Sequence, residues 1–592
     1  GRQARPKLYD LFVQKAEPLI PSERRIGAKE RLAADGSVVR ALNAAEIASV
    51  VRSVKKVRPD SVGVCFLFSF RNARHEKQIA AALRASGYLV SVSHEILPEF
   101  REYERTATTA INAYLTPVMS GYLRETSERI AELSGDKILS RQLGRGNEQF
   151  KLTRVSIMQS NGGIISAEQA AREPVRTILS GPAGGVIGAA HSAKLAGITR
   201  GISFDMGGTS TDVALLSGEL ITTNESIVAG VPVAVPMLEI QTVGAGGGSI
   251  ARFDQGGALR VGPESAGAIP GPICYGQGTR PTVTDAHAVL GHLGNRGLLG
   301  GTFSLDVAHA RELMRGRLKT DGRGFRTVEA FAEGIIAVAN AVMEKAIRVI
   351  SVERGHDTRD YTLIAFGGAG PLHACALAGA LEMQGVLVPI FPGGLSALGI
   401  LRADVVKEFS RTVLLRGDQV TESRGLLNKL FAELDAQGIR ALREESFART
   451  DMRVEHRLDA RYAGQAYDLS VGAEGDFIAA FHQAHDQRYG YHDAGRKVEI
   501  VNVRCRATGI TVKPATVKAP RRRHGEKLVA AEKLALTFER RPRKTNLFAR
   551  EDLRAGDAFR GPAVVMEYSA TTLIPPDWNA RVDAYGQLLL SR

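Results

Sequence analysis

Strand-like apolar runs and amphipathic helical stretches alternate in the first part of the chain. A helical stretch begins near Asn43 and is followed by the apolar run of residues 62–68, which has the pattern of a buried strand. A second helical stretch lies near residues 76–86, and residues 89–92 again have the pattern of a strand. Because strands that alternate with helices usually pair in parallel, this order predicts an α/β layer. Residues 99–115 are predicted to form one further helix.

The rest of the chain divides into two stretches with different patterns. Residues 117–404 contain short apolar strands followed by glycine-rich turns and helices of small residues. After residue 405 come a helical stretch at 426–447, an extended segment at 453–471, a helix at 477–489 and several strand-like runs. We therefore predict three regions: an α/β part at 1–116, a core at 117–410 and an α+β domain at 411–592.

Composition narrows the class of protein. The chain has 592 residues, 63 glycines and a formal net charge of +14. Its four cysteines are far apart in the sequence, which argues against a disulfide scaffold and favours a cytoplasmic protein. No uninterrupted apolar run is long enough to predict a membrane span. The basic clusters at 521–524 and 540–544 lack interleaved aromatic residues, so they are predicted to be solvated loops rather than a nucleic-acid surface.

The clearest chemical signal is a glycine turn bracketed by two acids. Two strand-like runs flank the sequence Asp205-Met-Gly-Gly-Thr-Ser-Thr-Asp212, which predicts a hairpin whose turn binds an anion. The glycines are expected to adopt backbone angles closed to other residues and so to aim N–H groups at a phosphate, while the hydroxyls add further donors. The predicted phosphate-binding residues are Gly207, Gly208, Thr209, Ser210 and Thr211. Asp205 is then placed to hold Mg²⁺ or to orient a nucleophile, and a plain Gly-Gly hairpin turn is the competing interpretation.

A second glycine-rich turn joins a buried strand to a helix. Residues 361–366 have the strand pattern, and the turn after them contains Gly367, Gly368 and Gly370. Pro371 suits the first position of a helix. A helix N-terminus presents free N–H groups that suit a nucleotide's phosphate or packing beneath its adenine, but neither a Walker A sequence nor a complete G-x-G-x-x-G is present. Alone, this turn is weak evidence.

Other candidate positions compete with structural roles. Asp285 and His292 lie seven residues apart on a predicted helix, which is wide for a metal pair, and we favour Asp285 as a helix N-cap or as a group behind a site. His482 and His485 lack a third ligand at metal-site spacing, which favours packing roles. Further glycine-rich turns fit hinges between lobes as well as ligand contacts, and they lie at residues 160–163, 180–185, 244–249 and 392–394.

Taken together, these motifs resemble the ATP-dependent hydantoinase/5-oxoprolinase family, specifically its HyuA-type subunit, within the actin/hexokinase/Hsp70-like ATPase superfamily. The resemblance rests on residues 205–212 and 366–373 and on blocks that follow in the family's order, at 97–106, 180–185, 282–286, 461–467, 488–491 and 561–564. It implies an α/β fold with an ATPase-like core at 117–410. The core would be preceded by the remainder of the family's amino-terminal α/β domain and followed by its carboxy-terminal α+β domain.

The resemblance implies a reaction that uses ATP and Mg²⁺. ATP would phosphorylate the oxygen of a cyclic amide such as a hydantoin or 5-oxoproline, and water would then open the ring. Asp205 and Asp212 would be the catalytic residues, with Mg²⁺ on Asp205 and, as a weaker candidate, on Asp285. Glycine N–H groups, hydroxyls and a carboxylate supply the positioning and charge neutralisation that phosphoryl transfer needs.

The resemblance also implies partners. A HyuB-type subunit is expected, and neither nucleic acid nor a membrane is. The family normally opens with a first phosphate loop, whereas this sequence contains only the second, at residues 205–212. Either the sequence is a fragment, or a separate chain carries the missing loop and is a further expected partner. Two other functions stay open: a subunit of a ketone carboxylase of the acetone/acetophenone type, and a non-catalytic nucleotide-binding scaffold.

Overall fold

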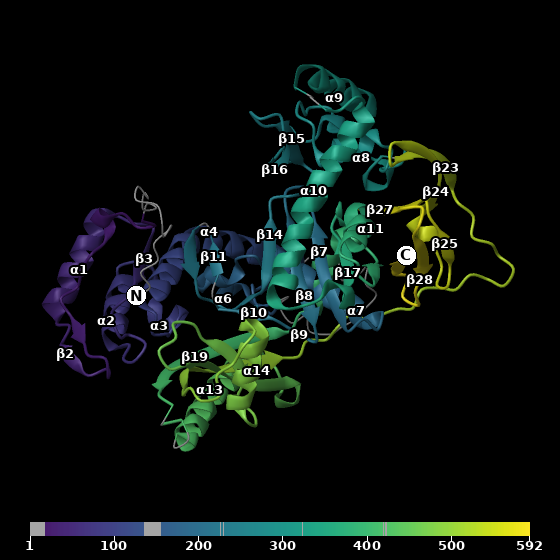
Figure 1. Ribbon diagram of the computed structural model, residues 1–592. Coiled ribbons are helices and arrows are strands. Elements are labelled where there is room, and N and C mark those ends of the chain that lie inside the picture. Colours follow the sequence, from purple (N-terminus) through teal and green to yellow (C-terminus); the bar gives the residue numbers. More distant parts are fainter. Residues whose placement is uncertain are drawn as a thin grey trace. The chain divides into compact units, whose positions relative to one another are not determined.

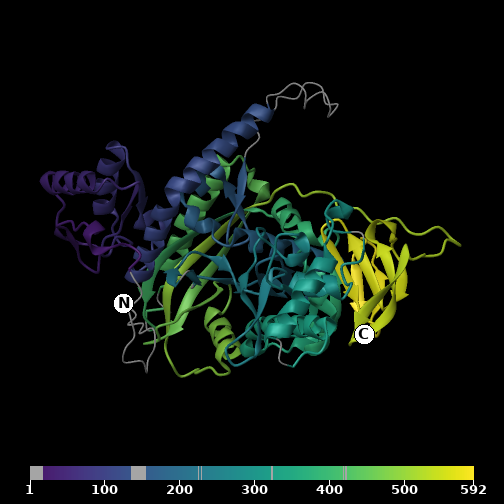
Figure 2. The same cartoon turned by 90° about the horizontal axis from the view of Figure 1, so that it is seen from above.

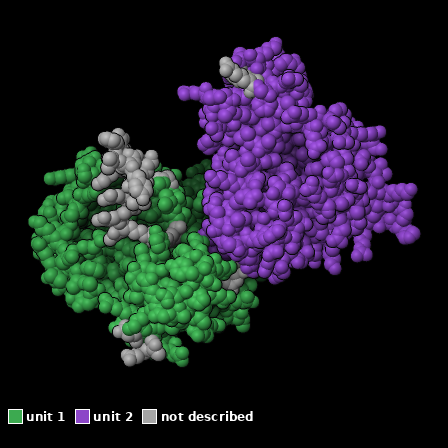
Figure 3. All heavy atoms as spheres, in the orientation of Figure 1, with its two compact units in different colours: residues 1–180, 222–237, 404–512 green, residues 181–221, 238–403, 513–592 purple. Residues whose placement is uncertain are grey.

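The computed structural model describes residues 18–134 and 155–592, apart from positions 225, 229, 296, 322–323, 418 and 421–422 (Figure 1). The chain forms two compact units, each made of three separate stretches (Figure 3). Unit 1 comprises residues 1–180, 222–237 and 404–512, and unit 2 comprises 181–221, 238–403 and 513–592. The boundaries predicted at 116/117 and 410/411 divide the chain differently and stay a prediction.

The amino-terminal part of unit 1 is the predicted α/β layer. Strands β3 (Ser61–Val64) and β4 (Leu89–Val92) pair in parallel, and α1 (Ala44–Val57) and α2 (Arg74–Ala85) alternate with them. The side chain of Asn43 accepts a hydrogen bond from the Glu46 N–H and caps α1. Buried apolar residues of these helices and strands share one core. The parallel pairing of β3 and β4 confirms the prediction.

A six-stranded sheet forms the second part of unit 1. Its order is β21 (Leu469–Gly472), β20 (Met452–Tyr462), β22 (Val498–Gly509), β19 (Val405–Leu415), β6 (Ile164–Ser166) and β5 (Ser156–Met158). Helix α13 (Arg424–Glu444) lies against β19, β20 and β22. Its buried leucines, at positions 427, 430, 434 and 442, lie on one face of the helix, which packs on the sheet. Helix α14 (Phe477–Tyr489) packs on β21 and has the predicted bounds.

Unit 1 also contains one long helix and several short elements. Helix α4 (Glu102–Ser134) extends beyond the predicted helix at 99–115. The short elements are α3 (Ser93–Ile96), α6 (Ala167–Arg172), β1 (Arg31–Leu32), β2 (Val38–Arg40), β10 (Thr222–Thr223), β11 (Ser226–Val228), β12 (Val231–Val233) and β13 (Met237–Leu238).

A mixed sheet organises unit 2. Its strand order is β14 (Ile240–Val243), β8 (Thr211–Ser217), β7 (Arg200–Met206), β17 (Thr362–Phe366), β18 (Gly385–Val388), β29 (Leu588–Ser591), β28 (Asn579–Val582) and β25 (Ala558–Arg560), and β9 (Glu219–Leu220) pairs with β8. The pairs β7–β17 and β17–β18 are parallel, whereas β8 returns antiparallel to β7. All five residues of β17 are buried, as expected for a central parallel strand.

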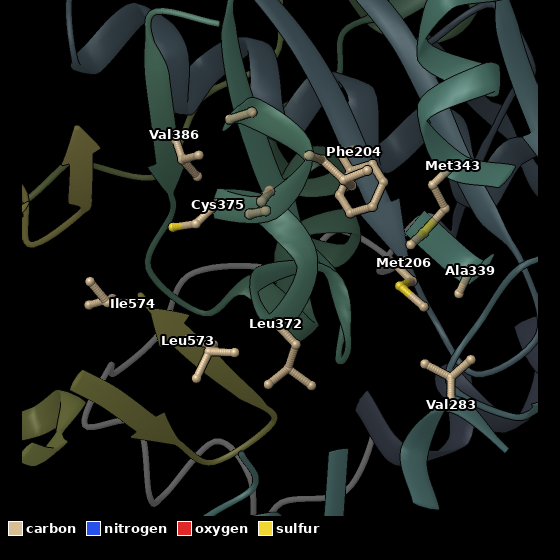
Figure 4. Packing of buried hydrophobic residues seen from close by; sticks show 14 of the residues in the cluster. Phe204, Met206, Val283, Ala339, Met343, Leu372, Cys375, Val386, Leu573 and Ile574 are labelled. Carbon is tan, nitrogen blue, oxygen red and sulfur yellow. The ribbon is translucent and has the colours of Figure 1, made fainter. Parts of the chain in front are cut away.

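Helices and a large apolar core hold this sheet in place. The helices are α7 (Ser180–Leu195), α8 (Val283–Val289), α9 (Val307–Asp321), α10 (Val328–Ile350), α11 (Gly370–Ala380) and α12 (Leu395–Arg402). Figure 4 shows Phe204 and Met206 of β7 among Met343 of α10 and Val283 of α8, and all four belong to one cluster. Packing of these side chains thus fixes the end of β7, just before the turn that follows it.

Two further β structures complete unit 2. Strands β23 (Glu532–Phe538), β24 (Arg541–Ala549), β26 (Ala563–Glu567) and β27 (Ala570–Ile574) form a sheet, seen among the yellow strands of Figure 2, and β15 (Ser249–Phe253) pairs with β16 (Leu259–Ser265). Residues 513–525 contain no helix and only an isolated bridge at Arg521, which confirms the predicted loop. Within the described residues, every helix is too short or too polar to cross a membrane.

Candidate functional site

The acid-bracketed turn forms the predicted hairpin. Strands β7 and β8 pair so that Asp205 lies directly opposite Asp212, and Met206 opposite Thr211. The Gly207 N–H donates to the Ser210 carbonyl at 3.1 Å and closes the turn. Like charges at directly opposed positions of a strand pair repel each other. This arrangement therefore has an energetic cost that a plain hairpin avoids.

The second glycine-rich turn lies against the first. The Ala369 N–H donates to the Met206 carbonyl at 3.0 Å, and the Gly367 N–H donates to the Pro392 carbonyl at 3.0 Å. Gly367 has a φ of +78°, and a Cβ there would overlap Oδ1 of Asp205, so this position requires glycine. The structure thus brings together the two motifs that the sequence singled out, together with the turn at residues 392–394.

Glycines of the loop at residues 244–249 support the hairpin from behind. The N–H groups of Gly247 and Gly248 donate to the carbonyls of Gly207 and Gly208 at 2.9 and 2.7 Å. A Cβ on Gly246 would lie 2.7 Å from the Gly208 backbone, closer than real Cβ atoms approach. The sequence left open whether this loop is a hinge or contacts a ligand. The structure shows a third role, because its glycines let two backbone segments pack closely.

Glycines also bring α7 and α12 together. A Cβ on Gly184 would lie 2.8 Å from the Ser396 carbonyl oxygen, and one on Gly188 would lie 2.6 Å from that of Leu395. This close packing fixes the start of α12, whose Ser396 hydroxyl is hydrogen-bonded to Asp205. The small residues that follow Ser180 therefore help to position Ser396, which is hydrogen-bonded to Asp205 of the acidic pair.

The front of the hairpin turn is open. Apart from the adjoining residues of the chain, no atom of the described residues lies within 4 Å of the place that a Cβ would occupy on Gly207 or Gly208, and neither glycine has a left-handed φ. The expectation that these glycines adopt backbone angles closed to other residues is therefore wrong. What the two glycines provide is open space at the front of the turn. Within the described part of the chain, the N–H groups of Gly208, Thr209 and Ser210 donate to no protein acceptor. Three neighbouring free N–H groups can bind an anion.

The two carboxyls beside this opening are held in an unfavourable environment. Burial, and secondarily the charge of Asp212, raises the pKa of Asp205 to about 6, although the Ser396 hydroxyl opposes the shift. Burial also raises the pKa of Asp212, against a hydrogen bond from the Thr242 hydroxyl at 2.5 Å. A divalent cation would relieve both effects, and carboxylate oxygens are the donors that Mg²⁺ prefers. The residues present therefore fit Mg²⁺.

Thr211 has a structural role rather than the predicted phosphate-binding one. It is fully buried, and its hydroxyl donates to the Ala245 carbonyl at 2.6 Å. Thr209, in contrast, is exposed at the tip of the turn, and Ser210 is half-buried. Sequence alone did not separate these hydroxyls, because the alternation of a strand that begins at Thr211 decides which of them points inward.

Asp285 is the centre of a capping box. Its carboxylate accepts hydrogen bonds from the N–H groups of Ile273, Cys274 and Thr282 and from the Thr282 hydroxyl, at 2.7–3.1 Å. The N-cap of α8 is Thr282, and Asp285 is its reciprocal partner three residues on. With four donors already on this buried carboxylate, we assign Asp285 to structure instead of metal binding.

A buried chain of three histidines lies close by and was missed in the sequence. His287 and His292 of the α8 region join through their Nδ1 atoms at 3.0 Å, and His287 and His373 of α11 join through their Nε2 atoms at 3.2 Å. Since His292 must donate to the Thr537 carbonyl, each ring in turn accepts from the next. Nδ1 of His373, the last acceptor, lies 2.6 Å from Oδ1 of Asn340, so the Asn340 amide has to turn and present its NH2 group as the donor. Burial lowers the pKa of His292 to about 4 and that of His373 to about 3, so the chain is neutral and ties α8, α10 and α11 together.

Family models match nearly the whole chain. The model described as hydantoinase/oxoprolinase matches residues 105–409, which include the entire candidate site. The chain belongs to the hydantoinase/oxoprolinase family. The family's N-terminal region matches residues 1–87, and its C-terminal domain matches 416–591. The family resemblance deduced from the sequence motifs is confirmed.

Individual relatives agree with this assignment. The chain is 33% identical to caprolactamase subunit alpha of Pseudomonas jessenii, over 97% of this chain and 82% of that protein. It is also 33% identical to 5-oxoprolinase 1 of Arabidopsis thaliana, and this match covers 99% of this chain but 48% of the longer plant protein.

Solved structures share the fold of this hydantoinase/oxoprolinase family member. The crystal structure of ATP-dependent caprolactamase from Pseudomonas jessenii matches with a TM-score of 0.83 and 32% identity, over 98% of this chain and 84% of that one. Nucleotide-free acetone carboxylase matches with a TM-score of 0.73 at 24% identity, over 98% and 82% of the two chains. The predicted α/β fold class is confirmed at the level of a mixed α/β fold.

Proposed function

We propose that this hydantoinase/oxoprolinase family member is the ATP-using subunit of a cyclic amidohydrolase. The observation that carries the proposal is the pair of opposed carboxyls, Asp205 and Asp212, beside a turn with free N–H groups and open glycines. Relatives named caprolactamase and 5-oxoprolinase support it, because the substrates in those names are cyclic amides. The site lies wholly within unit 2.

We infer further that unit 2 contains an ATPase core of the actin/hexokinase/Hsp70 type. Its support is the β7–β8 hairpin turn at the edge of parallel strands, next to a glycine turn that opens helix α11. The N–H groups of Gly208, Thr209 and Ser210 would bind ATP phosphates, and Gly368 leaves room for the nucleoside part. The nearest atom to a Cβ on Gly368 would be the Ser569 carbonyl oxygen at 3.5 Å.

The reaction that we propose has two stages. The amide oxygen of the ring attacks the γ-phosphorus of ATP, ADP leaves, and the phosphorylated amide becomes a good electrophile; water then adds to its carbon, the C–N bond breaks and phosphate is released. Asp205 and Asp212 would hold Mg²⁺, which when bound neutralises phosphate charge. The chain's own contribution is to orient the phosphates on fixed N–H groups.

A second subunit is part of the proposal. The relative from Pseudomonas jessenii is named as a subunit alpha, so a partner subunit is expected here, and a HyuB-type protein that completes the hydrolysis is our specific candidate. Ketone carboxylation remains the alternative function, but the acetone carboxylase likeness supports the fold alone.

Ring-dependent ATP turnover tests the proposed function. The purified chain, alone and with a HyuB-type partner, is supplied with Mg·ATP and with caprolactam, 5-oxoproline or hydantoin, and ADP release and ring-opened product are measured. We expect ADP release to rise at least tenfold with one of these rings. ATP turnover that needs a ketone and bicarbonate instead would establish the carboxylase alternative, and no ATP binding under any condition would leave a scaffold.

A further inference from the structure

Unit 1 contains a compact group of three metal-ligating side chains that the proposed reaction does not use. Asp435 comes from helix α13, His456 from β20 and Cys505 from β22. Their ligand atoms all lie within 4.8 Å of one another. Among the described residues, this is the one group of three or more histidine, cysteine and acidic side chains with such convergence.

The sheet and the helix place these donors on one face. His456 and Cys505 are directly opposite each other in the antiparallel β20–β22 pair, so their side chains leave the same side of the sheet. Helix α13 crosses that face closely, since a Cβ on its Gly438 would lie 2.7 Å from the Cβ of Ala507. Asp435, one turn earlier in α13, is thereby brought down onto the two strand residues.

The distances are close to those of a metal tripod. Oδ1 of Asp435 lies 2.7 Å from Nε2 of His456 and 3.5 Å from Sγ of Cys505. Tetrahedral Zn²⁺ with ordinary bond lengths separates such ligand atoms by about 3.4–3.6 Å. The Asp435–His456 distance has to open by less than about 1 Å, and the His456–Cys505 distance, which lies within 4.8 Å, has to settle in the same range.

Access and surroundings also suit a bound ion. The side chains of Asp435 and His456 are 30% and 26% exposed, so an ion can enter from solvent, while Cys505 is 1% exposed. Phe431 stacks on the His456 ring, with 4.3 Å between centroids, and fixes its orientation. An ordered imidazole beside a buried thiol lowers the rearrangement that binding requires.

We propose that Asp435, His456 and Cys505 bind a borderline divalent transition metal, Zn²⁺ being the expected ion, with water in the fourth position. Thiolate, imidazole and carboxylate together favour Zn²⁺ or Co²⁺ over Mg²⁺ or Ca²⁺. On binding, the Cys505 thiol loses its proton to solvent and the sulfur bonds to the metal. The ion would tie α13 to the sheet and stabilise unit 1.

Cobalt spectroscopy tests the proposal on the full-length chain, freed of metal by chelation and carrying no histidine tag. We expect one equivalent of Co²⁺ per chain and a thiolate-to-cobalt charge-transfer band in the near ultraviolet. Cys505→Ala should abolish the band and weaken binding at least about 100-fold, whereas Cys65→Ala, a matched change at a half-buried free thiol of the same unit, should keep both. No band in the wild type, or a band that survives in Cys505→Ala, would overturn the site.

A second measurement guards against a misfolded variant. Asp435→Asn keeps the size of the side chain, and its melting temperature is compared with that of the wild type in Zn²⁺ and in chelator. We expect Zn²⁺ to raise the melting temperature of the wild type and of His482→Gln, but not of Asp435→Asn or His456→Gln. If Zn²⁺ stabilises all four proteins equally, the ion binds elsewhere and the proposal fails. Neither readout depends on ATP turnover, so this site can fail while the proposed function stands.

Discussion

Two aspartates of unit 2, the buried Asp285 and the half-buried Asp205, differ in how well their charge is satisfied. Asp285 accepts four hydrogen bonds within a capping box, whereas Asp205 has the Ser396 hydroxyl and faces a second carboxyl across the hairpin. A satisfied carboxylate fixes the backbone around it, while an unsatisfied one is stabilised by whatever cation reaches it. The contrast distinguishes a structural aspartate from a candidate catalytic one, although the sequence had kept Asp285 as a weaker candidate for Mg²⁺.

The glycines show the same contrast. Gly246 and Gly248 are pressed against the backbone of Gly208, and Gly367 is pressed against Asp205, so packing within the protein accounts for them. Gly207 and Gly208 face open space, and among the described residues neither a close neighbour nor a left-handed φ requires glycine there. Glycines of the first kind build the site, and glycines of the second kind leave room for a ligand.

The largest expected effect comes from Asp205→Asn. If this carboxylate holds the cation of the phosphoryl-transfer step, ring-dependent ATP turnover should fall at least about 1,000-fold. The control is Asp360→Asn, which removes a half-exposed carboxylate paired with Arg200 and should keep the wild-type rate. Steady-state ADP release measures both. A rate within a few-fold of wild type for Asp205→Asn would remove Asp205 from the mechanism.

Asp285→Ala should instead damage the fold. Loss of four hydrogen bonds leaves buried N–H groups without an acceptor, so the free energy of unfolding should drop by about 2–4 kcal/mol. Urea denaturation of the wild type and the variant measures the change. Should the variant keep its stability but lose Mg²⁺-dependent nucleotide binding, Asp285 would belong to the site after all.

A matched pair of glycine substitutions separates room for a ligand from packing. Gly368→Val should weaken nucleotide binding by about 10–100-fold with the fold intact, because the position is exposed and the nearest atom to the new Cβ, the Ser569 carbonyl oxygen, is at an ordinary contact distance of 3.5 Å. Gly246→Val should lower the melting temperature, because its side chain would collide with the Gly208 backbone. Calorimetric titration and thermal unfolding provide the two readouts. An unaltered nucleotide Kd for Gly368→Val would place the nucleoside elsewhere.

The pH dependence of stability reports on Asp205. Its pKa is raised in the folded state to about 6 from an unfolded value near 3.8, so the folded state holds the proton more tightly. Its contribution to stability is fully present below about pH 4 and is lost as the pH rises through 6, at a cost of roughly 1–3 kcal/mol. Asp205→Asn should therefore become more stable relative to wild type between pH 4 and 7. Parallel stability curves over this range would contradict the raised pKa.

The smallest effect should distinguish two threonines of the hairpin. Thr211→Val removes a buried hydrogen bond to Ala245 and should cost about 1–2 kcal/mol of stability while the nucleotide Kd stays within twofold. Thr209→Val, at the exposed tip, should leave stability unchanged and weaken nucleotide binding a few-fold. Chemical denaturation and nucleotide titration on both variants decide the matter, and the reverse pattern would exchange their roles.

Local patterns predicted much of the fold. Residues 89–92 and 477–489 form the predicted strand and helix with the same bounds, and the hairpin at 205–212 and the strand, turn and helix at 361–376 formed as expected. Such elements depend on periodicity, turn residues and caps that lie close together in the chain. The division of the chain into two units, each built from three separate stretches, has no local signature, because it depends on which distant stretches pack together.

The candidate site shows the same limit. Sequence identified the acids and the glycine turns, but it also included Thr211 and Asp285, which the fold uses internally, and it missed the histidine chain and the Asp435, His456 and Cys505 group. His373 lies 86 positions after His287, and Asp435 lies 21 and 70 positions before His456 and Cys505, so only tertiary contacts join these residues.

By itself the sequence determined the family, the local elements and the chemical types gathered around the hairpin turn, because each is encoded by residues adjacent or nearly adjacent in the chain. Only the tertiary structure decided which carboxylate is satisfied and which is not, and which glycine faces a ligand and which faces the protein. The physical reason is that burial, hydrogen-bond partners and free space are properties of packed neighbours, and those neighbours come from segments far apart in the sequence.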